Sequence, residues 1–237
     1  MSFERIGPTV DGRPERVRHL QSLIELVFIP GGLSNLGAPQ DDQEQFENEA
    51  KHELPIEAFY LGVVPVTWQQ WRNVQCDAPF HFRFVGNEAW PAESVSYERV
   101  QQFLKGSGGH LRLPTEWEWE HACRGGNPAP RYGDIQDIAH WAPPNDGMTP
   151  QPVGGLRANG FGLHDMIGMV WEWTCSEGRE EPRCRVLRGG SFQSLSRSLR
   201  ASARYEVEPQ HVDRQVGFRV AASVECVVNN LRAVEAP

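Results

Sequence analysis

The segment from Asn127 to Gly168 constrains the fold of this chain more than any other part of the sequence. It is rich in Gly, Pro, Asn and Asp and holds only short apolar pieces, yet it is far longer than a usual connection in a compact domain. Such a segment keeps a defined path only when aromatic anchors, a metal or many backbone hydrogen bonds fix it. Trp141, Trp171 and Trp173 are the anchors on offer, so we expect a loop-rich fold held by aromatic rings.

Three helices are predicted from their starting residues. Thr67 with Gln70 and Thr115 with Glu118 form two capping boxes, in which side chains satisfy amides that the first helical turn leaves without partners. Ser96 precedes a third helix, whose apolar residues fall on one face. Short apolar runs bounded by turn residues predict strands, and these lie at Leu26–Ile29, Ile56–Val64, Val186–Leu187 and Gly217–Ala221.

The N-terminal residues, Met1 to Ser22, carry many charges and little periodicity. We expect residues 1–24 to form an arm or short helix outside the core, residues 25–222 to form one domain, and residues 223–237 to form a tail. The acidic segment from Gly37 to Glu53 is expected to be an exposed loop. Together these features predict one α+β domain.

Charge and hydropathy exclude several classes of protein. The chain has 23 Lys and Arg against 31 Asp and Glu, a net charge of −8, and no basic face, so nucleic acid is not an expected partner. No apolar run approaches the roughly 20 residues of a membrane-spanning helix. The polar N-terminus does not resemble a signal peptide, so we expect a cytoplasmic protein without a membrane partner. The cysteines lack zinc-ligand spacing and are expected to be small buried hydrophobes; they are Cys76, Cys123, Cys175, Cys184 and Cys226.

Several phrases are too specific for composition to explain. They occur in a fixed order and are Val66-Thr67, Val95-Ser96, Leu111 to Glu120, Cys123 to Gly126, Asn159 to Met166, Trp171-Glu172-Trp173, Arg188-Gly189-Gly190-Ser191-Phe192 and Gly217-Phe218-Arg219. From Glu25 to Ala222 the chain resembles the formylglycine-generating-enzyme (sulfatase-modifying factor) family. The resemblance implies a C-type-lectin-like α+β fold, with few helices, short twisted strands and long loops locked by tryptophans.

The resemblance also implies where a metal would be held. Family oxidases bind copper(I) through two cysteines that follow the Gly-Gly-Ser phrase, but here the corresponding positions hold Ser194 and Leu199. Hydroxyl and alkyl groups do not replace soft thiolates, and Cys175 and Cys184 lie upstream of the phrase, so copper is not expected. Other relatives are iron-dependent sulfoxide synthases, whose iron is held by histidines of a separate helical domain. This chain has no room for that domain unless a partner supplies it.

Calcium is a further feature of the family, bound near the Trp-Glu-Trp phrase. Where the family commonly has Gly-Asn, this chain has Gly168-Met169, and a thioether is a poor ligand for a hard cation. Oxygens of Asp146, Asn159 and Asp165 leave calcium open, although turn formation also explains these residues.

No catalytic residue is predicted. Glu116, Glu118 and Glu120 invite an acid–base role, but Glu118 is explained by its capping box and acidic residues suit a first helical turn. Glu172 is expected to be a hydrogen-bonded structural acid. No histidine shares a motif with a serine or cysteine, so no nucleophile triad is predicted; the histidines considered are His121, His140, His164 and His211.

The segment from Gln193 to Gln215 is the predicted binding surface, because framework phrases flank a polar, mixed stretch on both sides. Tyr and Ser supply contact area and adaptable hydrogen bonds at low entropy cost. The predicted ligand-binding residues are Gln193, Ser194, Ser196, Ser198, Tyr205, Glu206, Gln210, His211 and Gln215. The predicted function is a non-oxidase binding module, whose protein or small-molecule ligand the sequence does not identify.

Two alternatives stay open at this point. The first is a metal-dependent oxidoreductase with a relocated or partner-completed metal site. The second is a retroelement-diversified binding protein, which the spacing of the flanking phrases also resembles. Rewriting adenines of an AAC codon gives Ser, Leu, Tyr, Val or His, but it does not give the Gln and Glu residues of this segment.

Overall fold

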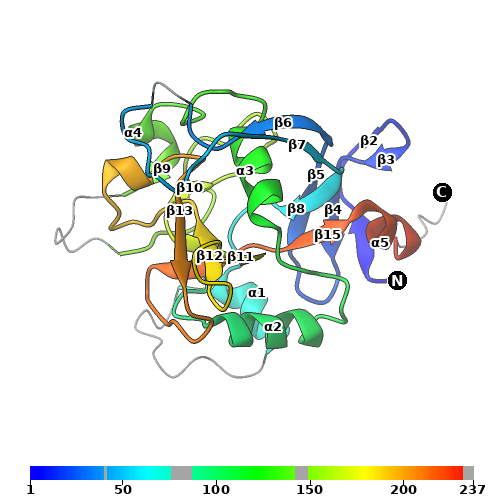
Figure 1. The fold of residues 1–237 in the computed structure, drawn as a ribbon. Helices are drawn as coiled ribbons and strands as arrows, with labels where there is room; N and C mark the ends of the chain where they lie inside the picture. Colours follow the sequence, from blue (N-terminus) through cyan, green and yellow to red (C-terminus); the bar gives the residue numbers. More distant parts are fainter. Residues whose placement is uncertain (40–41, 76–86, 142–148, 232–237) are drawn as a thin grey trace.

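The computed structural model describes residues 1–39, 42–75, 87–141 and 149–231 (Figure 1). Its larger sheet has five antiparallel strands in the order β1-β4-β5-β8-β15. The strands are β1 (Phe3–Arg5), β4 (Arg16–His19), β5 (Glu25–Ile29), β8 (Phe59–Gly62) and β15 (Ala221–Ser223). The first and last strands in sequence thus lie at opposite edges of one sheet.

The second sheet has four strands in the order β13-β12-β11-β14, with β11 and β14 parallel. They are β11 (Trp171–Glu177), β12 (Arg185–Arg188), β13 (Arg204–Val207) and β14 (Val216–Phe218). Three two-stranded ladders complete the β-structure: β2 (Thr9–Val10) with β3 (Arg13–Pro14), β6 (Gly32–Leu36) with β7 (His52–Ile56), and β9 (Ala139–His140) with β10 (Ile167–Gly168).

The three predicted helix starts are confirmed. Thr67 and Thr115 cap α1 (Trp68–Arg72) and α3 (Glu116–Arg124) with both hydrogen bonds of the capping box, and Ser96 caps α2 (Tyr97–Gly106). Helix α3 ends at Gly125, whose φ of 56° is left-handed and suits glycine. The remaining helices are α4 (Ile135–Ile138), α5 (Val224–Asn229) and a 3-10 turn, Ser196–Ser198. None of the helices in the described part of the chain is long and apolar enough to cross a bilayer.

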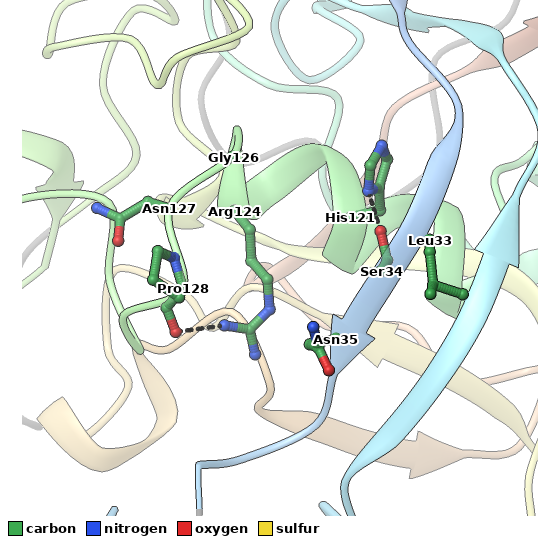
Figure 2. Close-up of a pocket in the computed structure, with 8 residues that line it drawn as sticks. All are labelled: Leu33, Ser34, Asn35, His121, Arg124, Gly126, Asn127 and Pro128. Atoms are coloured by element: carbon green, nitrogen blue, oxygen red, sulfur yellow. Dashed lines mark hydrogen bonds between the residues drawn. The ribbon is translucent and has the colours of Figure 1, made fainter.

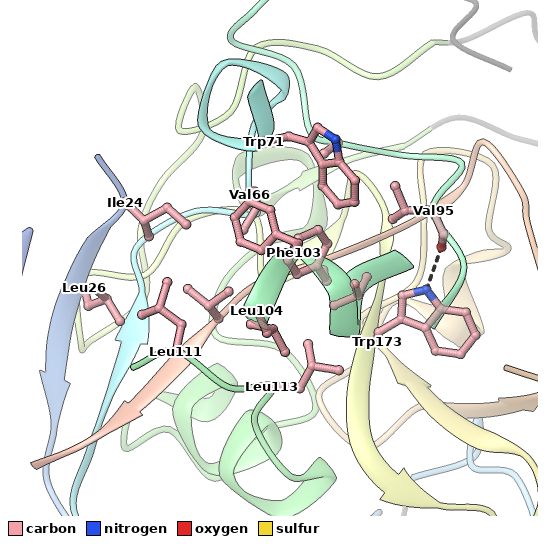
Figure 3. Close-up of a cluster of buried hydrophobic side chains, with 14 of the residues drawn as sticks. Ile24, Leu26, Val66, Trp71, Val95, Phe103, Leu104, Leu111, Leu113 and Trp173 are labelled. Atoms are coloured by element: carbon pink, nitrogen blue, oxygen red, sulfur yellow. Dashed lines mark hydrogen bonds between the residues drawn. The ribbon is translucent and has the colours of Figure 1, made fainter. Parts of the chain in front are cut away.

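The five-stranded sheet separates two hydrophobic clusters. Alternate residues of a strand face opposite sides, so on β8 Tyr60 joins one cluster while Phe59 and Leu61 join the other. The first, which we call the aromatic cluster, contains Trp71 stacked on Phe103 at 5.2 Å between ring centroids. Figure 3 shows this cluster, with the indole of Trp173 donating to the carbonyl of Val95 at 2.9 Å. Trp173 is therefore enclosed, but the described residues of this cluster include none from 127–168, the segment that it was expected to anchor.

The second cluster lies beside side chains that are charged and yet buried. Helix α3 contributes Trp119 to it and packs against β11, β12 and the β6–β7 hairpin (Figure 1). Five arginines are buried among the described residues, and one of them, Arg204, is described with the pocket below. We call the other four the buried arginines; they are Arg124, Arg188, Arg200 and Arg219, each at most 8 % exposed. Each donates to a buried carboxylate and to backbone carbonyls, and the carbonyls bound include those of Gly37, Glu44, Gly62, Pro128, His164, Arg197, Ala201 and Ser202. All of these except Gly62 at the end of β8 and Arg197 in the 3-10 turn lie in loops, so guanidinium groups supply partners for loop backbone.

Three expectations about peripheral segments are wrong. The N-terminal arm belongs to the core, because Phe3 and Val17 lie on sheet strands and are fully buried. The tail begins inside the fold, since Ser223 ends β15 and Val227 of α5 is buried; residues 232–237 lie outside the described chain. The acidic segment is not simply exposed, because Glu49 is buried against Arg200. Charge misled the sequence analysis here, because arginine pairs and short strands bury polar segments.

Candidate functional site

The predicted surface borders a pocket of about 460 Å³. Three aromatic side chains form part of its wall: Phe46, Trp171 and Tyr205. Tyr205 stands on β13, is 55 % exposed, and its ring centroid lies 6.1 Å from that of Trp171 at the start of β11. Four polar side chains complete the wall, namely Asn48, Ser194, Ser198 and Arg204. We call this the aromatic pocket.

A segment far away in the sequence supplies one wall of the aromatic pocket. Arg200 donates to Glu49 at 2.7 and 2.8 Å and to Asp42 at 2.9 Å, and these bonds fix the segment from Asp42 to Glu49. Arg197 and Arg200 also lie over the ring of Phe46, at 5.1 and 5.7 Å from its centroid. The sequence analysis missed Phe46 and Asn48, because this segment meets the predicted surface only through long-range contacts, chiefly those of Arg200 and also those of Ser196 and Ser202.

Arg204 has a buried but incomplete set of partners. Its Nε donates to Glu116 at 3.0 Å and its Nη1 to Glu206 at 2.7 Å, but Nη2 is buried with no hydrogen-bond partner among the described residues. The Oδ1 of Asn48 is likewise buried and unpartnered. Burial opposes ionisation of Glu206, but hydrogen bonds from the amide of Arg179 and from Arg204 outweigh it and lower the pKa of Glu206. Two residues of the pocket wall thus each hold a buried polar atom without a partner. Arg179 also pairs with Glu116, so the two carboxylates and the two guanidinium groups balance in charge.

The structure brings together only part of the predicted residue set. Ser194, Ser198 and Tyr205 line the aromatic pocket. Ser196 borders a neighbouring hollow, where its Oγ lies 3.4 Å from Glu44, and Glu206 lies beside Arg204. The rest of the set lies outside the aromatic pocket.

The remaining predicted residues have partners or positions of their own. Gln210 donates to Glu98 in the first turn of α2, and His211 follows it by one residue. Gln215 accepts from Ser191, and Gln193 donates its amide to the same hydroxyl. The segment therefore does not present one continuous face, and the binding role of each residue stays a prediction.

Comparison with known proteins decides the family. The sequence profile of the Sulfatase-modifying factor enzyme 1-like domain matches residues 13–224, most of the chain. This chain belongs to the sulfatase-modifying factor family. The match begins within the N-terminal segment, in agreement with the place of β4 in the core.

Named members of the sulfatase-modifying factor family differ in what they do. The serine/threonine-protein kinase pkn1 of Chlamydia caviae is 27 % identical over 91 % of this chain and 41 % of its own length. The formylglycine-generating enzyme of Mycobacterium tuberculosis is 35 % identical over 46 % of this chain and 43 % of its own. The chain thus spans about two fifths of the length of the kinase. PvdO from Pseudomonas aeruginosa superimposes with a TM-score of 0.76 at 21 % identity, covering 86 % of this chain and 95 % of that one, and this likeness confirms the expected fold.

The copper site of the family's oxidases does not fit the residues of this chain. Ser194 Oγ accepts from the amide of Ser191 at 2.9 Å, and Leu199 is fully buried in the second hydrophobic cluster. Neither side chain supplies the thiolate that copper(I) prefers. Within the described residues the four cysteines are free thiols, and no group of three or more His, Cys, Asp or Glu could hold a metal ion.

The described residues do not form a calcium site either. Both polar atoms of the Asn159 side chain already have hydrogen-bond partners. Its Nδ2 donates to the carbonyls of Ala122 and Cys123 at the end of α3, while its Oδ1 accepts from the amides of Phe161 and Leu163. Asp165 accepts from Gly154 through Oδ2 and keeps only Oδ1 without a partner. Asp146 lies outside the described residues. The residues that are described do not make an oxygen cage.

The acidic residues considered for catalysis serve the framework. Glu118 completes its capping box and pairs with Arg112, and Glu116 pairs with Arg204. Glu120 pairs with Arg124 and Arg188. Glu172 accepts from Trp119 and from Arg219, both at 2.7 Å. The structural interpretation of Glu118 and Glu172 is therefore confirmed.

Proposed function

We propose that this chain is a binding member of the sulfatase-modifying factor family that works without copper oxidation. Its ligand binds in the aromatic pocket. The observation that carries the proposal is the aromatic wall of the pocket, whose polar members Arg204 and Asn48 each hold a buried atom, Nη2 and Oδ1, that no described residue satisfies. A buried polar atom without a partner costs about 1–3 kcal/mol, so a ligand that reaches both atoms when these side chains adjust binds favourably.

The charge balance of the wall narrows the chemical class of the ligand. Glu116 and Glu206 pair with Arg204, and Arg179 also pairs with Glu116, so two carboxylates balance two guanidinium groups and the pocket offers no spare charge to an ion. Aromatic rings favour flat, apolar groups, and the unpartnered donor and acceptor favour a carbonyl next to an N–H. An uncharged ligand that joins an aromatic group to an amide meets all three requirements.

The position of the pocket supports a function other than oxidation. Ser194 lines the pocket and occupies the place of a copper-binding cysteine in the oxidases that the chain resembles. The hydroxyl is hydrogen-bonded to Ser191. An apolar, hydroxyl-bearing wall suits a reversible ligand better than it suits thiol chemistry.

N-acetyl-phenylalaninamide is a suitable probe, because it is neutral and carries one ring and two amides. Calorimetric titration of the whole chain should detect binding, and Tyr205→Ala should weaken it roughly fivefold, since aromatic contacts contribute about 0.5–1.5 kcal/mol. His211→Ala is the matched control, because His211 lies on the same segment but outside the pocket. Equal losses in both variants, or no binding by the wild type, would contradict the proposed site.

A second assay tests the non-oxidase part of the proposal. The chain is supplied with copper(I), oxygen and a cysteine-containing peptide, and formylglycine is sought by mass spectrometry. We expect no turnover. Repeated turnover with stoichiometric copper would support the alternative of a relocated metal site.

A further inference from the structure

A second pocket, of about 200 Å³, lies between the β6–β7 hairpin and the end of α3, away from the residues of the aromatic pocket. Figure 2 shows Ser34 of β6 and His121 of α3 facing each other on one side of it, with Arg124 opposite. These two residues are 87 positions apart, which is why no sequence motif joins them. The pocket places a hydroxyl beside an imidazole next to open space.

The hydrogen bonds of His121 fix which nitrogen carries the proton. Nε2 lies 2.9 Å from the carbonyl oxygen of Pro30, and a carbonyl only accepts, so Nε2 donates and carries the hydrogen. In the neutral ring Nδ1 is then an acceptor. Ser34 Oγ lies 2.5 Å from Nδ1, so the hydroxyl donates a hydrogen bond to the imidazole. A nucleophile, a base and a group that orients the base are thus in line.

The surroundings hold the imidazole in one orientation. His121 lies in the last turn of α3, and the carbonyl of Pro30 accepts from its Nε2. Phe161 packs against the ring, with centroids 5.8 Å apart, and limits its rotation. Asn35 and Asn127 add side-chain amides to the same pocket wall, and such donors stabilise an oxyanion.

We propose that Ser34 and His121 form an acyl-transfer site for small esters, since the pocket beside them measures about 200 Å³. Ser34 Oγ attacks the ester carbonyl carbon while its proton moves to Nδ1 of His121. The bond from this carbon to the alcohol oxygen breaks, and the alcohol leaves with that proton. Water then attacks the acyl-serine, His121 takes a proton from the water and returns it to Ser34 Oγ, and the carboxylic acid is released.

A second serine–histidine pair in the chain provides an internal comparison. Ser22 Oγ lies 2.8 Å from His19 Nδ1, but both residues are at most 1 % exposed. The amide of Ser22 also faces that nitrogen, and the amide of Ile24 donates to Ser22 Oγ. Here the same contact closes a turn, and neither residue lines the aromatic pocket or the pocket beside His121. Of these two pairs, the one formed by Ser34 and His121 lines a pocket.

A serine-reactive fluorophosphonate tests the proposal on the whole chain. We expect one adduct, which peptide mapping assigns to Ser34 and which is absent from Ser34→Ala. His121→Gln should slow labelling about 100-fold, because it removes the base, whereas Ser22→Ala should label like the wild type. Hydrolysis of p-nitrophenyl acetate should follow the same order. Thermal melts of each variant establish that it is folded.

A further variant tests the proposal even if Ser34→Ala or His121→Gln fails to fold. Ser34→Cys should react with iodoacetamide faster when His121 is present than in the double variant with His121→Gln. The proposal is overturned if the folded wild type takes no adduct, if the adduct lies on another residue, or if labelling is independent of His121. None of these outcomes bears on binding in the aromatic pocket, so the two proposals fail separately.

Discussion

The aromatic cluster and the buried arginines stabilise two neighbouring parts of the molecule in different ways. In the aromatic cluster Trp71, Phe103 and Phe218 contact one another through stacked and edge-to-face rings. In the other part, guanidinium groups contact buried carboxylates and loop carbonyls. Elements with paired backbones need only apolar packing, whereas long irregular segments also need partners for their carbonyls. The buried arginines supply these partners, and they allow loops to lie inside a compact fold.

This comparison predicts that removing one buried arginine is as damaging as removing a core aromatic ring. Arg219→Met strands the buried carboxylate of Glu172 and should lower the free energy of unfolding by about 3–5 kcal/mol, which matches the roughly 3–5 kcal/mol expected for Trp71→Ala. Urea unfolding followed by fluorescence measures both. Arg183→Met is the control, because its ion pair with Glu181 is largely exposed and contributes little. A loss for Arg219→Met as small as the control would break the comparison.

Glu93 shows what a buried carboxylate does without an arginine partner, because the described residues provide no ion pair for it. Burial raises its pKa to about 7, a hydrogen bond from Ser94 opposes the shift, and Asp213 adds to it. The folded state therefore holds a proton that the unfolded state releases near its ordinary value of 4.5. Stability from this group is greatest below about pH 4.5 and is lost as pH rises through 7.

Glu93→Gln removes that dependence. At pH 8 the variant should unfold with a free energy up to about 3 kcal/mol higher than the wild type, and near pH 4 the two should agree closely. Unfolding in urea at several pH values measures the difference. Parallel curves for the two proteins across this range would show that Glu93 ionises normally in the fold.

The smallest expected effect comes from a local cap beside the aromatic cluster. Ser96→Ala removes the hydroxyl that accepts from the amide of Arg99 at the start of α2, and it should cost about 1 kcal/mol. Ser96→Asp should restore most of this loss, because aspartate also caps helices well. An effect as large as that of Arg219→Met would mean that α2 depends on its cap more than on its buried face.

The starts of three helices were predictable from local pattern. The capping residues Thr67, Ser96 and Thr115 begin helices where expected, because a cap and its partner lie three residues apart. Trp119 was missed as an anchor, and Trp171 is partly exposed on the pocket wall. Both tryptophans stand in recognisable phrases, but only packing decides which ring is enclosed.

Only one wall of the aromatic pocket was predictable from the sequence. Ser194, Ser198 and Tyr205 were expected from the segment between two framework phrases, and they line the aromatic pocket. Phe46 and Asn48 were not expected, since an acidic stretch has the composition of a solvated loop until Arg200 pairs with Glu49. The pairing of Ser34 with His121 was also missed, because it joins a strand to a helix 87 positions further along the chain.

The sequence alone determined the family, the helix starts and the replacement of the oxidase cysteines, because each depends on residue identity at short, fixed spacing. The tertiary structure decided which charges are buried, which loops form pocket walls and which hydroxyl meets an imidazole. Those outcomes depend on contacts between residues many positions apart. A buried carboxylate, carbonyl or guanidinium has lost its hydrogen bonds to water, so it is stable only where the fold supplies a partner.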